Sequence, residues 1–261
     1  MSRIVIFDSG VGGLSIYQEV VKKCPNHDYI FVSDNLAFPY GTKPETELID
    51  RVISVVKALE MQYKPDVLVV ACNTASTVAL PHLRSLFNFP IVGVVPAIKP
   101  AAKLSKSNVI GLLATPGTIE RDYTNSLINE FAKDCTVIKV GSSRLVEIAE
   151  HKMCGNKPSI DEIKHELMPF FSYERLDCLV LACTHFPLLN NEISIVFKEK
   201  NNALKLIDSG LAIASRVSEL CPNPIKKSCE DRVAVFTKTL TSEPLTSYLK
   251  SFGFNQVDML T

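Results

Sequence analysis

The stretches DVLVVAC at residues 66–72 and DCLVLAC at residues 177–183 repeat one pattern at a spacing of 111 residues. Five of the seven positions are identical. Each run is short, apolar and rich in Val and Leu, which is typical of a strand buried on both faces in a parallel sheet. Each run also ends in a cysteine, at Cys72 and Cys183. The repeat predicts two related units with a thiol at the same place in each.

A second, weaker repeat supports the same division. VIFDSG at 5–10 is echoed by IGLLATPG at 110–117, which places Gly10 opposite Gly117. The Pro-rich stretch 95–100 is the natural connection into the second unit. Asp208-Ser209-Gly210 repeats the sequence of residues 8–10 and marks the return of the chain to the first unit. We therefore expect a first domain at 1–98 plus 208–261, closed by the C-terminal segment, and a second at 99–207.

Short β-branched runs alternate with helical patterns along most of the chain, which indicates parallel sheets with helices on both faces. The fold expected is α/β, with two similar three-layer α/β/α domains of mainly parallel sheets and the active site in the cleft between them. One helix is indicated by apolar residues at helical spacing from Leu48 to Leu59, and Ser159-x-x-Glu162 is a capping box that starts another. The predicted strands are 3–7, 29–33, 67–71, 91–95, 109–114, 136–140, 178–182, 204–207 and 233–236.

The composition limits the class of protein. The 261 residues are 46% hydrophobic and 21% charged, and 28 basic side chains balance 28 acidic ones, with a pI near 6.9. This balance excludes a disordered chain and argues against nucleic acid as the primary partner, because phosphate binding needs a basic surface. The sequence has no run of about 18 apolar residues, and it shows no export signal before the strand that begins near Arg3. We expect a cytoplasmic protein without a membrane partner.

The eight cysteines carry no CxxC pair, so reduced thiols are expected, most of them small core residues. The sequence assigns no role to six of them or to the last 40 residues. The six are Cys24, Cys135, Cys154, Cys178, Cys221 and Cys229.

Cys72 and Cys183 are the strongest candidates for chemistry. Ligands bind open parallel sheets at the carboxyl ends of the strands, and the helix that follows lowers the pKa of a thiol from about 8.5. Two thiols that face each other across a cleft suit one reaction: one thiolate removes a proton from carbon while the other thiol protonates the opposite face. This predicts inversion or racemisation without a cofactor. The alternative is that both are buried structural cysteines.

The loop Asp8-Ser9-Gly10-Val11-Gly12-Gly13 superficially resembles a dinucleotide loop, with Asp34 as the acid for a ribose. Ser15 replaces the third glycine, and Asp8 would direct a negative charge at the pyrophosphate. Asp8 is either a helix-capping side chain or a carboxylate that serves Cys72.

His185 follows Cys183 by two residues, and Pro187 suits the first turn of a helix. A core or capping role is one interpretation of His185; the other is that it tunes the neighbouring thiol. A zinc site would need two further ligands at suitable spacing, and none is evident, so no metal is expected.

Polar and turn residues surround the same predicted edge. The loops 38–42 and 115–118 suit close approach to a ligand, and backbone N–H groups and hydroxyls could bind a carboxylate-bearing substrate. Each of these residues alone could be an ordinary cap or turn residue. The candidate side chains are Ser9, Asn73, Thr74, Thr115, Thr118 and Thr184.

Four motifs together resemble the cofactor-independent glutamate racemases: DSGVGG at 8–13, PYG at 39–41, ACNTAS at 71–76 and ACTHFP at 182–187. The resemblance runs from residue 3 to about 215. Aspartate racemases of the same superfamily usually have an acidic residue in place of the Thr184-His185 pair. The rivals are therefore a racemase of aspartate or another amino acid and, from a different class, a small-ligand or nucleotide-binding protein with structural cysteines.

The resemblance implies a role for each catalytic candidate. Cys72 would be the base toward D-glutamate and Cys183 the base toward L-glutamate, with Asp8 and His185 assisting their respective thiols. An acidic residue of the second domain would align best with Glu150, although Glu147 is close enough to leave both open. The implied substrate contacts are Asp8, Ser9, Pro39, Tyr40, Gly41, Asn73, Thr74, Thr115, Thr118, Thr184 and His185.

The resemblance also implies a cellular role, which is the supply of D-glutamate for peptidoglycan in the bacterial cell wall. Residues 114–123 look like those of the group that is activated by UDP-N-acetylmuramoyl-L-alanine. The sequence leaves open whether the activator is required, how far the domains open and which oligomer forms, a homodimer among the options.

Overall fold

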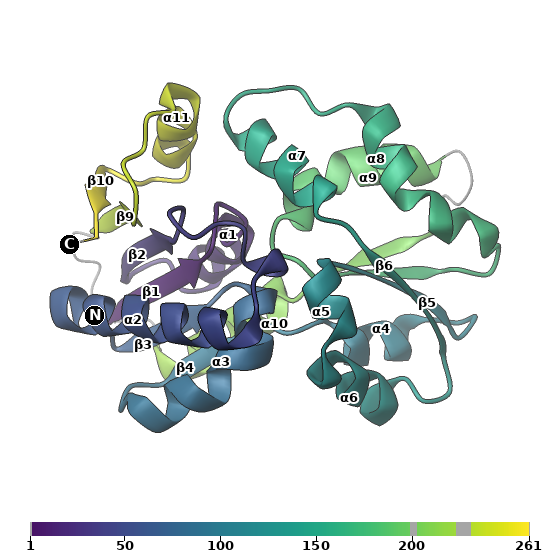
Figure 1. The fold of residues 1–261 in the computed structure, drawn as a ribbon, viewed down its shortest axis with the longest axis horizontal. Coiled ribbons are helices and arrows are strands. Elements are labelled where there is room, and N and C mark those ends of the chain that lie inside the picture. The colour runs from purple at the N-terminus through teal and green to yellow at the C-terminus, as the bar shows by residue number, and fades with distance from the viewer. Residues whose placement is uncertain (1, 199–202, 223–230, 261) are drawn as a thin grey trace.

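A computed structural model describes residues 2–198, 203–222 and 231–260. Within these residues the strands form two sheets, and every strand pair is parallel. One sheet has six strands in the order β10-β9-β2-β1-β3-β4, and the other has four in the order β6-β5-β7-β8. Figure 1 shows the two sheets in separate lobes, each covered by helices, so the expected α/β class is confirmed.

The six-stranded sheet is built from both ends of the chain. Its strands are β1 (Arg3–Asp8), β2 (Asp28–Ser33), β3 (Val67–Val70), β4 (Ile91–Gly93), β9 (Arg232–Phe236) and β10 (Gln256–Met259). The helices of this lobe are α1 (Leu14–Lys23), α2 (Glu45–Tyr63), α3 (Asn73–Leu86), α10 (Gly210–Leu220) and α11 (Glu243–Ser251), with the short 3-10 helix η1 (Tyr40–Thr42).

The four-stranded sheet lies wholly within the middle of the chain. Its strands are β5 (Val109–Ala114), β6 (Thr136–Gly141), β7 (Cys178–Leu181) and β8 (Lys205–Ile207). Its helices are α4 (Ile98–Leu104), α5 (Pro116–Glu120), α6 (Asp122–Phe131), α7 (Arg144–Met153), α8 (Ile160–Leu167) and α9 (Asn190–Lys198), with the 3-10 helices η2 (Met168–Ser172) and η3 (Phe186–Leu189).

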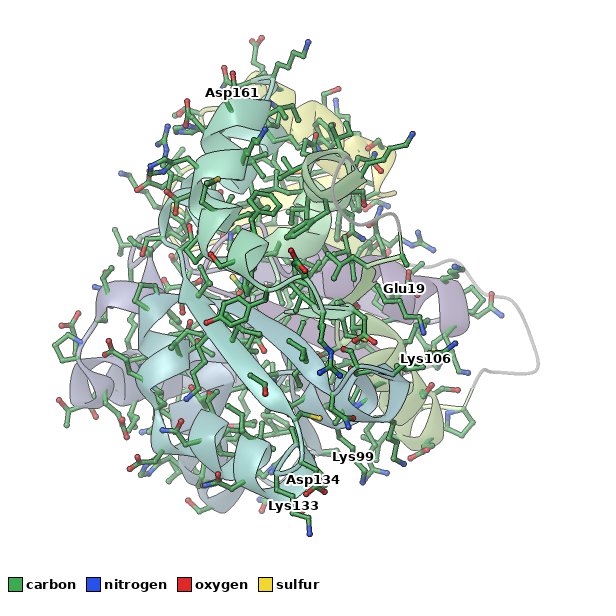
Figure 2. The ribbon with its side chains drawn as sticks, turned by 90° about the vertical axis from the view of Figure 1, so that its right-hand side faces the viewer. Glu19, Lys99, Lys106, Lys133, Asp134 and Asp161 are labelled. Atoms are coloured by element: carbon green, nitrogen blue, oxygen red, sulfur yellow. The ribbon has the colours of Figure 1, made fainter. Side chains whose placement is uncertain are left out.

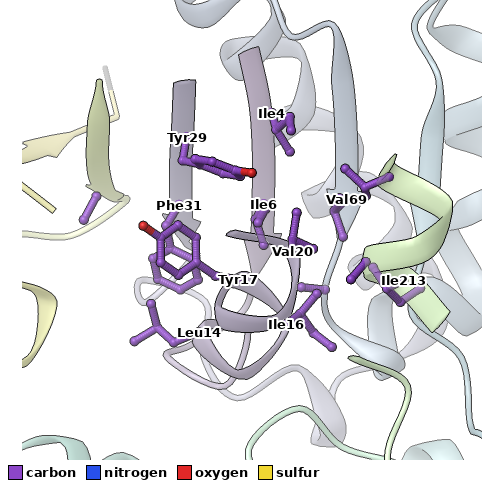
Figure 3. Close-up of a cluster of buried hydrophobic side chains, with 14 of the residues drawn as sticks. Ile4, Ile6, Leu14, Ile16, Tyr17, Val20, Tyr29, Phe31, Val69 and Ile213 are labelled. Carbon is purple, nitrogen blue, oxygen red and sulfur yellow. The ribbon is translucent and has the colours of Figure 1, made fainter. Parts of the chain in front are cut away.

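Alternation along the central strand β1 separates two cores in the larger lobe. Ile4 and Ile6 point to the side covered by α1, α10 and α11, and Figure 3 shows Leu14, Tyr17 and Ile213 on that side. The neighbouring positions along β1 point to the opposite core under α2 and α3. The residues at helical spacing in α2 are all buried there, as the periodicity predicts, namely Leu48, Val52, Val55, Val56 and Leu59.

The smaller lobe has the same layering. Apolar residues of α7, α8 and α9 pack on one face of its sheet, and those of α4 and α6 pack on the other. The predicted helix start is confirmed, because the Ser159 hydroxyl accepts a hydrogen bond from the Glu162 N–H at 3.3 Å where α8 begins. The reciprocal half of the capping box is not formed, because the Glu162 carboxylate accepts from Arg144 at 2.7 Å. Both lobes therefore have three layers.

The chain passes twice between the sheets, and the two crossings lie side by side. The first runs from β4 to α4, through the predicted Pro-rich stretch. The second runs from β8 to α10, and there the Ser209 hydroxyl donates to the Val95 carbonyl at 2.6 Å. This sheet membership supports our proposal that 1–98 plus 208–261 form one domain and 99–207 the other.

Two features differ from the expectation. Strand β10 and helix α11 were not predicted, because β10 has the exposed edge sequence QVDM, without the apolar run that marks a buried strand. The predicted strand 91–95 ends at Gly93, after which the chain leaves the sheet. Cys229 lies outside the described residues.

Charged side chains of both signs are interspersed on the surface, as Figure 2 shows for Lys133 beside Asp134. This mixing agrees with the balanced composition. None of the helices in the described part of the chain combines the length and apolar character needed to cross a membrane.

Candidate active site

A cavity of about 90 Å³ lies between the two lobes, at the carboxyl ends of their parallel strands. Strand ends and the loops after them supply its walls, in agreement with the general position of ligand sites in open α/β sheets. The lining residues are Ser9, Phe38, Pro39, Tyr40, Gly41, Thr42, Cys72, Asn73, Thr74, Thr115, Ser143, Val146, Glu147, Cys183, Thr184 and His185.

Cys72 is positioned by the junction of β3 and α3. It is the N-cap residue of α3, in an extended conformation, and only 5% of its surface is exposed. Its Sγ lies 3.7 Å from the Ser9 hydroxyl. Burial raises the pKa of the Cys72 thiol, and the negative charge of Asp8 raises it further. The predicted lowering of the pKa of Cys72 is therefore wrong, because desolvation of the thiolate outweighs the helix terminus in this closed pocket.

Asp8 lies behind Cys72 at the end of β1 and is fully buried. Its Oδ2 accepts a hydrogen bond from the Gly13 N–H at 2.7 Å, which is the capping role. Its Oδ1 is buried and has no hydrogen-bond partner among the described residues. Burial raises the pKa of Asp8, although the charge of His185 opposes this. One oxygen thus stabilises the loop, while the other has no partner among the described residues.

His185 connects the second thiol to a carboxylate. Its Nδ1 lies 3.7 Å from Cys183 Sγ, and its Nε2 lies 2.7 Å from Glu150 Oε1. Burial alone would lower the pKa of His185, but its hydrogen bonds and charge interactions with Cys183 and Glu150 raise it well above 6.5. Glu147 instead points to the rim of the cavity and pairs with Arg144 at 2.8 Å. The contact with His185 is therefore made by Glu150.

Two glycines of the first loop, Gly10 and Gly12, are explained by this histidine and carboxylate. A Cβ at Gly12 would lie 2.4 Å from His185 Nδ1, and one at Gly10 would lie 2.1 Å from Glu150 Oε1. The same Oε1 accepts a hydrogen bond from the Val11 N–H at 2.8 Å. Glycine is needed here because the second lobe approaches the backbone of the first so closely.

Asp34 forms hydrogen bonds to three side chains of the first lobe. Arg51 donates to both of its carboxylate oxygens, at 2.8 and 2.5 Å, and the hydroxyls of Tyr40 and Thr237 donate at 2.5 and 2.6 Å. These bonds lower the pKa of Asp34 despite its burial. Asp34 therefore holds Tyr40 in the cavity wall, and its oxygens have partners other than a ribose.

Three threonine hydroxyls meet across the boundary of the lobes. Thr74 Oγ1 lies 3.2 Å from that of Thr115 and 3.3 Å from that of Thr118, and the latter two are 2.9 Å apart. Thr115 is the N-cap residue of α5 and also accepts from the Thr118 N–H. This cluster brings the loops of both units to one wall, as the repeat predicts.

Nine of the eleven predicted substrate contacts line the cavity, together with both cysteines, while Asp8 and Thr118 lie behind its wall. The sequence missed five lining residues. Phe38 and Thr42 belong to a loop that the turn residues had indicated, and Glu147 was the alternative to Glu150. Ser143 and Val146 carry no motif and are recognised only from the fold. Among the described residues, no three His, Cys, Asp or Glu side chains are grouped so as to hold a metal ion.

Known proteins resemble this chain over nearly its full length. The Asp/Glu/Hydantoin racemase family model matches residues 4–217. The chain is 46% identical to the glutamate racemases of Pectobacterium atrosepticum and Salmonella typhimurium, over 98% of this chain and 90% and 91% of theirs. It resembles the crystal structure of Escherichia coli glutamate racemase in complex with L-glutamate and activator UDP-MurNAc-Ala, with a TM-score of 0.92 and 43% identity, covering 100% of this chain and 98% of that one. The glutamate racemase RacE1 from Bacillus anthracis gives a TM-score of 0.83 at 28% identity, covering 100% of this chain and 97% of that one. The chain therefore belongs to the Asp/Glu/hydantoin racemase family, as one of its glutamate racemases.

Proposed function

We propose that this enzyme interconverts L- and D-glutamate by two-base proton transfer between Cys72, Cys183 and the α-carbon of the substrate. The observation that carries the proposal is that both thiols line one cavity, each supplied by a different lobe. A substrate held between them would present one face of its α-carbon to each sulfur. No cofactor enters the scheme.

The proton balance of the reaction is simple. In the L-to-D direction the Cys183 thiolate takes the α-proton, and the electron pair left on carbon takes a proton from the Cys72 thiol on the opposite face. The enzyme then holds a Cys183 thiol and a Cys72 thiolate, which is the arrangement that the reverse reaction needs. Each turnover thus exchanges the protonation states of the two sulfurs.

The neighbours of each thiol suit these roles. Despite burial, the pKa of His185 is raised by its hydrogen bonds with Cys183 and Glu150, and its Nδ1 lies 3.7 Å from Cys183 Sγ, where a protonated ring would assist that thiol. Cys72, by contrast, is held as a thiol by burial and by Asp8. Asp8, with its free Oδ1, would take up the Cys72 proton when Cys72 must act as the base.

The cavity wall offers partners for both ends of an amino-acid substrate. The hydroxyls of Ser9, Thr74 and Thr184 would donate to carboxylates. Asn73 Oδ1 is buried and has no hydrogen-bond partner among the described residues, so it would accept a hydrogen bond from the substrate ammonium group. Removal of the Asn73 oxygen from water would be compensated when the substrate is bound.

Isotope incorporation tests the two-base scheme. In heavy water the second thiol exchanges with solvent, so newly formed D-glutamate should carry deuterium from the first turnover, while recovered L-glutamate stays mostly protiated. A single base acting on both faces would return some of the original proton to the product. Early product that retains the substrate proton would therefore contradict the scheme.

A related assay tests the substrate. L-Glutamate and L-aspartate are incubated separately without cofactor and analysed by chiral chromatography. Because the chain is 46% identical to glutamate racemases, glutamate should be strongly preferred. Comparable turnover of aspartate would contradict the specificity but leave the racemase chemistry intact.

The product D-glutamate would supply peptidoglycan synthesis in the bacterial cytoplasm. The Escherichia coli relative was solved with the activator UDP-MurNAc-Ala, and we propose the same activator here. Addition of this compound should raise kcat/KM; unchanged kinetics at saturating activator would contradict its role. Formation of a homodimer stays a prediction.

A further inference from the structure

Arg121 lies at the junction of α5 and α6 in the second lobe, yet its guanidinium binds the first lobe. Its Nη1 donates to the Thr74 carbonyl at 2.9 Å and to the Thr77 hydroxyl at 3.0 Å. The Thr77 hydroxyl in turn donates to the Thr74 carbonyl at 3.0 Å. One cation thus binds a carbonyl and a hydroxyl in the first turn of α3.

That turn carries the reacting groups of the first lobe. Cys72 is the N-cap of α3, Asn73 is its first residue, and both line the cavity. Arg121 itself does not line the cavity, and it is half-buried. Its contact therefore acts on the position of Cys72 from behind, through the backbone of α3.

A second close approach occurs at the same boundary. A Cβ at Gly117 of α5 would lie 2.8 Å from the carbonyl oxygen of Gly41, in the loop that forms another cavity wall. Figure 1 shows α5 beside the boundary with the larger lobe, and at Gly117 the backbones approach so closely that a side chain would not fit without a shift. Arg121 and Gly117 thus hold α5 against two parts of the cavity wall that come from the first lobe.

We propose that Arg121 is a positioning residue of the racemase, which holds the second lobe closed on the first turn of α3 and so sets the distance between Cys72 and Cys183. The inference rests on the proposed two-thiol function. A cation that crosses the boundary makes charge-assisted hydrogen bonds, which are stronger than those between neutral groups. Burial lowers the pKa of Arg121, although the charges of Glu45 and Cys72 oppose this.

The role predicts a specific kinetic signature. Without Arg121, a smaller fraction of the protein is in the closed state. The apparent affinity for both enantiomers falls in proportion to that fraction. For Arg121→Gln we expect kcat/KM to fall about 10- to 100-fold, because one or two charge-assisted hydrogen bonds are lost. The ratio of kcat in the two directions should keep its wild-type value, because closure serves both thiols equally. Arg121→Lys, which keeps one charged donor, should lie between Arg121→Gln and the wild type.

The matched control is Arg84→Gln. Arg84 also donates to a backbone carbonyl, that of Ile91, at 3.2 and 3.4 Å, but both partners lie in the first lobe and away from the cavity. This variant should retain wild-type kcat/KM. Thr77→Val removes the hydroxyl acceptor with little change in shape, and it should lower kcat/KM about 3- to 10-fold. In the double variant the two effects should not add, because both break one contact.

Amide hydrogen exchange gives a readout that does not depend on turnover. Exchange at residues 73–78 should be faster in Arg121→Gln than in the wild type and unchanged in Arg84→Gln. Wild-type exchange together with kcat/KM within about threefold of wild type would overturn the proposal. So would a shifted ratio of the two kcat values, or fully additive effects with Thr77→Val. If racemisation does not use the two thiols, the exchange result still tests the contact.

Discussion

Glu150 Oε1 accepts hydrogen bonds from the His185 ring at 2.7 Å and from the Val11 N–H at 2.8 Å, so one carboxylate oxygen orients a histidine of its own lobe and contacts the loop of the other. Glu147, one turn earlier on α7, makes neither bond and pairs with Arg144 near the cavity rim. The geometry thus distinguishes Glu150, which the resemblance favours, from Glu147, which the sequence had left open as the alternative.

This difference predicts unequal effects of the two amide substitutions. Glu150→Gln removes the charge that stabilises the imidazolium, and it should lower kcat by about tenfold or more. Glu147→Gln breaks only an exposed ion pair and should leave kcat within about threefold of wild type. Steady-state kinetics in both directions measure this. The assignment fails if Glu147→Gln is the more damaging change.

Replacement of either thiol should nearly abolish racemisation. A serine hydroxyl is a far weaker acid than a thiol, so neither Cys72→Ser nor Cys183→Ser can supply a base near neutral pH. We expect kcat to fall by about 100- to 10,000-fold in each, the range for loss of general acid–base catalysis. Cys178→Ser is the matched control, because Cys178 is a buried strand cysteine outside the cavity. A thiol variant that keeps most of its activity would show that its cysteine is structural.

His185 and Asp8 should each affect a different direction of the racemisation. His185 contacts Cys183, and the charge of Asp8 raises the pKa of Cys72. His185→Asn should therefore slow abstraction from L-glutamate more, and Asp8→Asn should slow abstraction from D-glutamate more. Because the enantiomers have equal free energy, kcat/KM must remain equal in both directions, and the change appears in kcat and KM separately. Near-normal kinetics in both variants would return the two residues to a capping role.

Asp8→Asn should also stabilise the fold at neutral pH. The pKa of Asp8 is raised in the folded protein, so the folded state binds its proton more tightly than the unfolded state does. Its ionisation therefore removes stability as the pH rises from about 3.8 through the folded pKa. We expect the Tm of Asp8→Asn to exceed the wild-type value by roughly 2–5 °C at pH 8, and the gap to close toward pH 4. Thermal unfolding across this range measures the gap, and a lower Tm for the variant at pH 8 would contradict the sign.

Much of the architecture could be predicted because its signals are local. Apolar runs mark buried strands, helical spacing marks α2, and a serine three residues before a glutamate marks the start of α8. The repeat predicted two cysteines at equivalent strand ends, and parallel strands bring their carboxyl ends to one edge of a sheet. The exposed strand β10 had no such signal and was missed.

The sequence by itself determined the α/β class, the two strand-end thiols and most of the cavity wall, since each depends on residues adjacent in the chain. Only the tertiary structure decided that Glu150 rather than Glu147 binds His185, that Arg121 reaches Thr74, and that the pKa of Cys72 is raised. The physical reason is that burial and the distances between charges depend on which remote segments meet. A helix terminus acts on its neighbour in sequence, but desolvation comes from the whole fold around it.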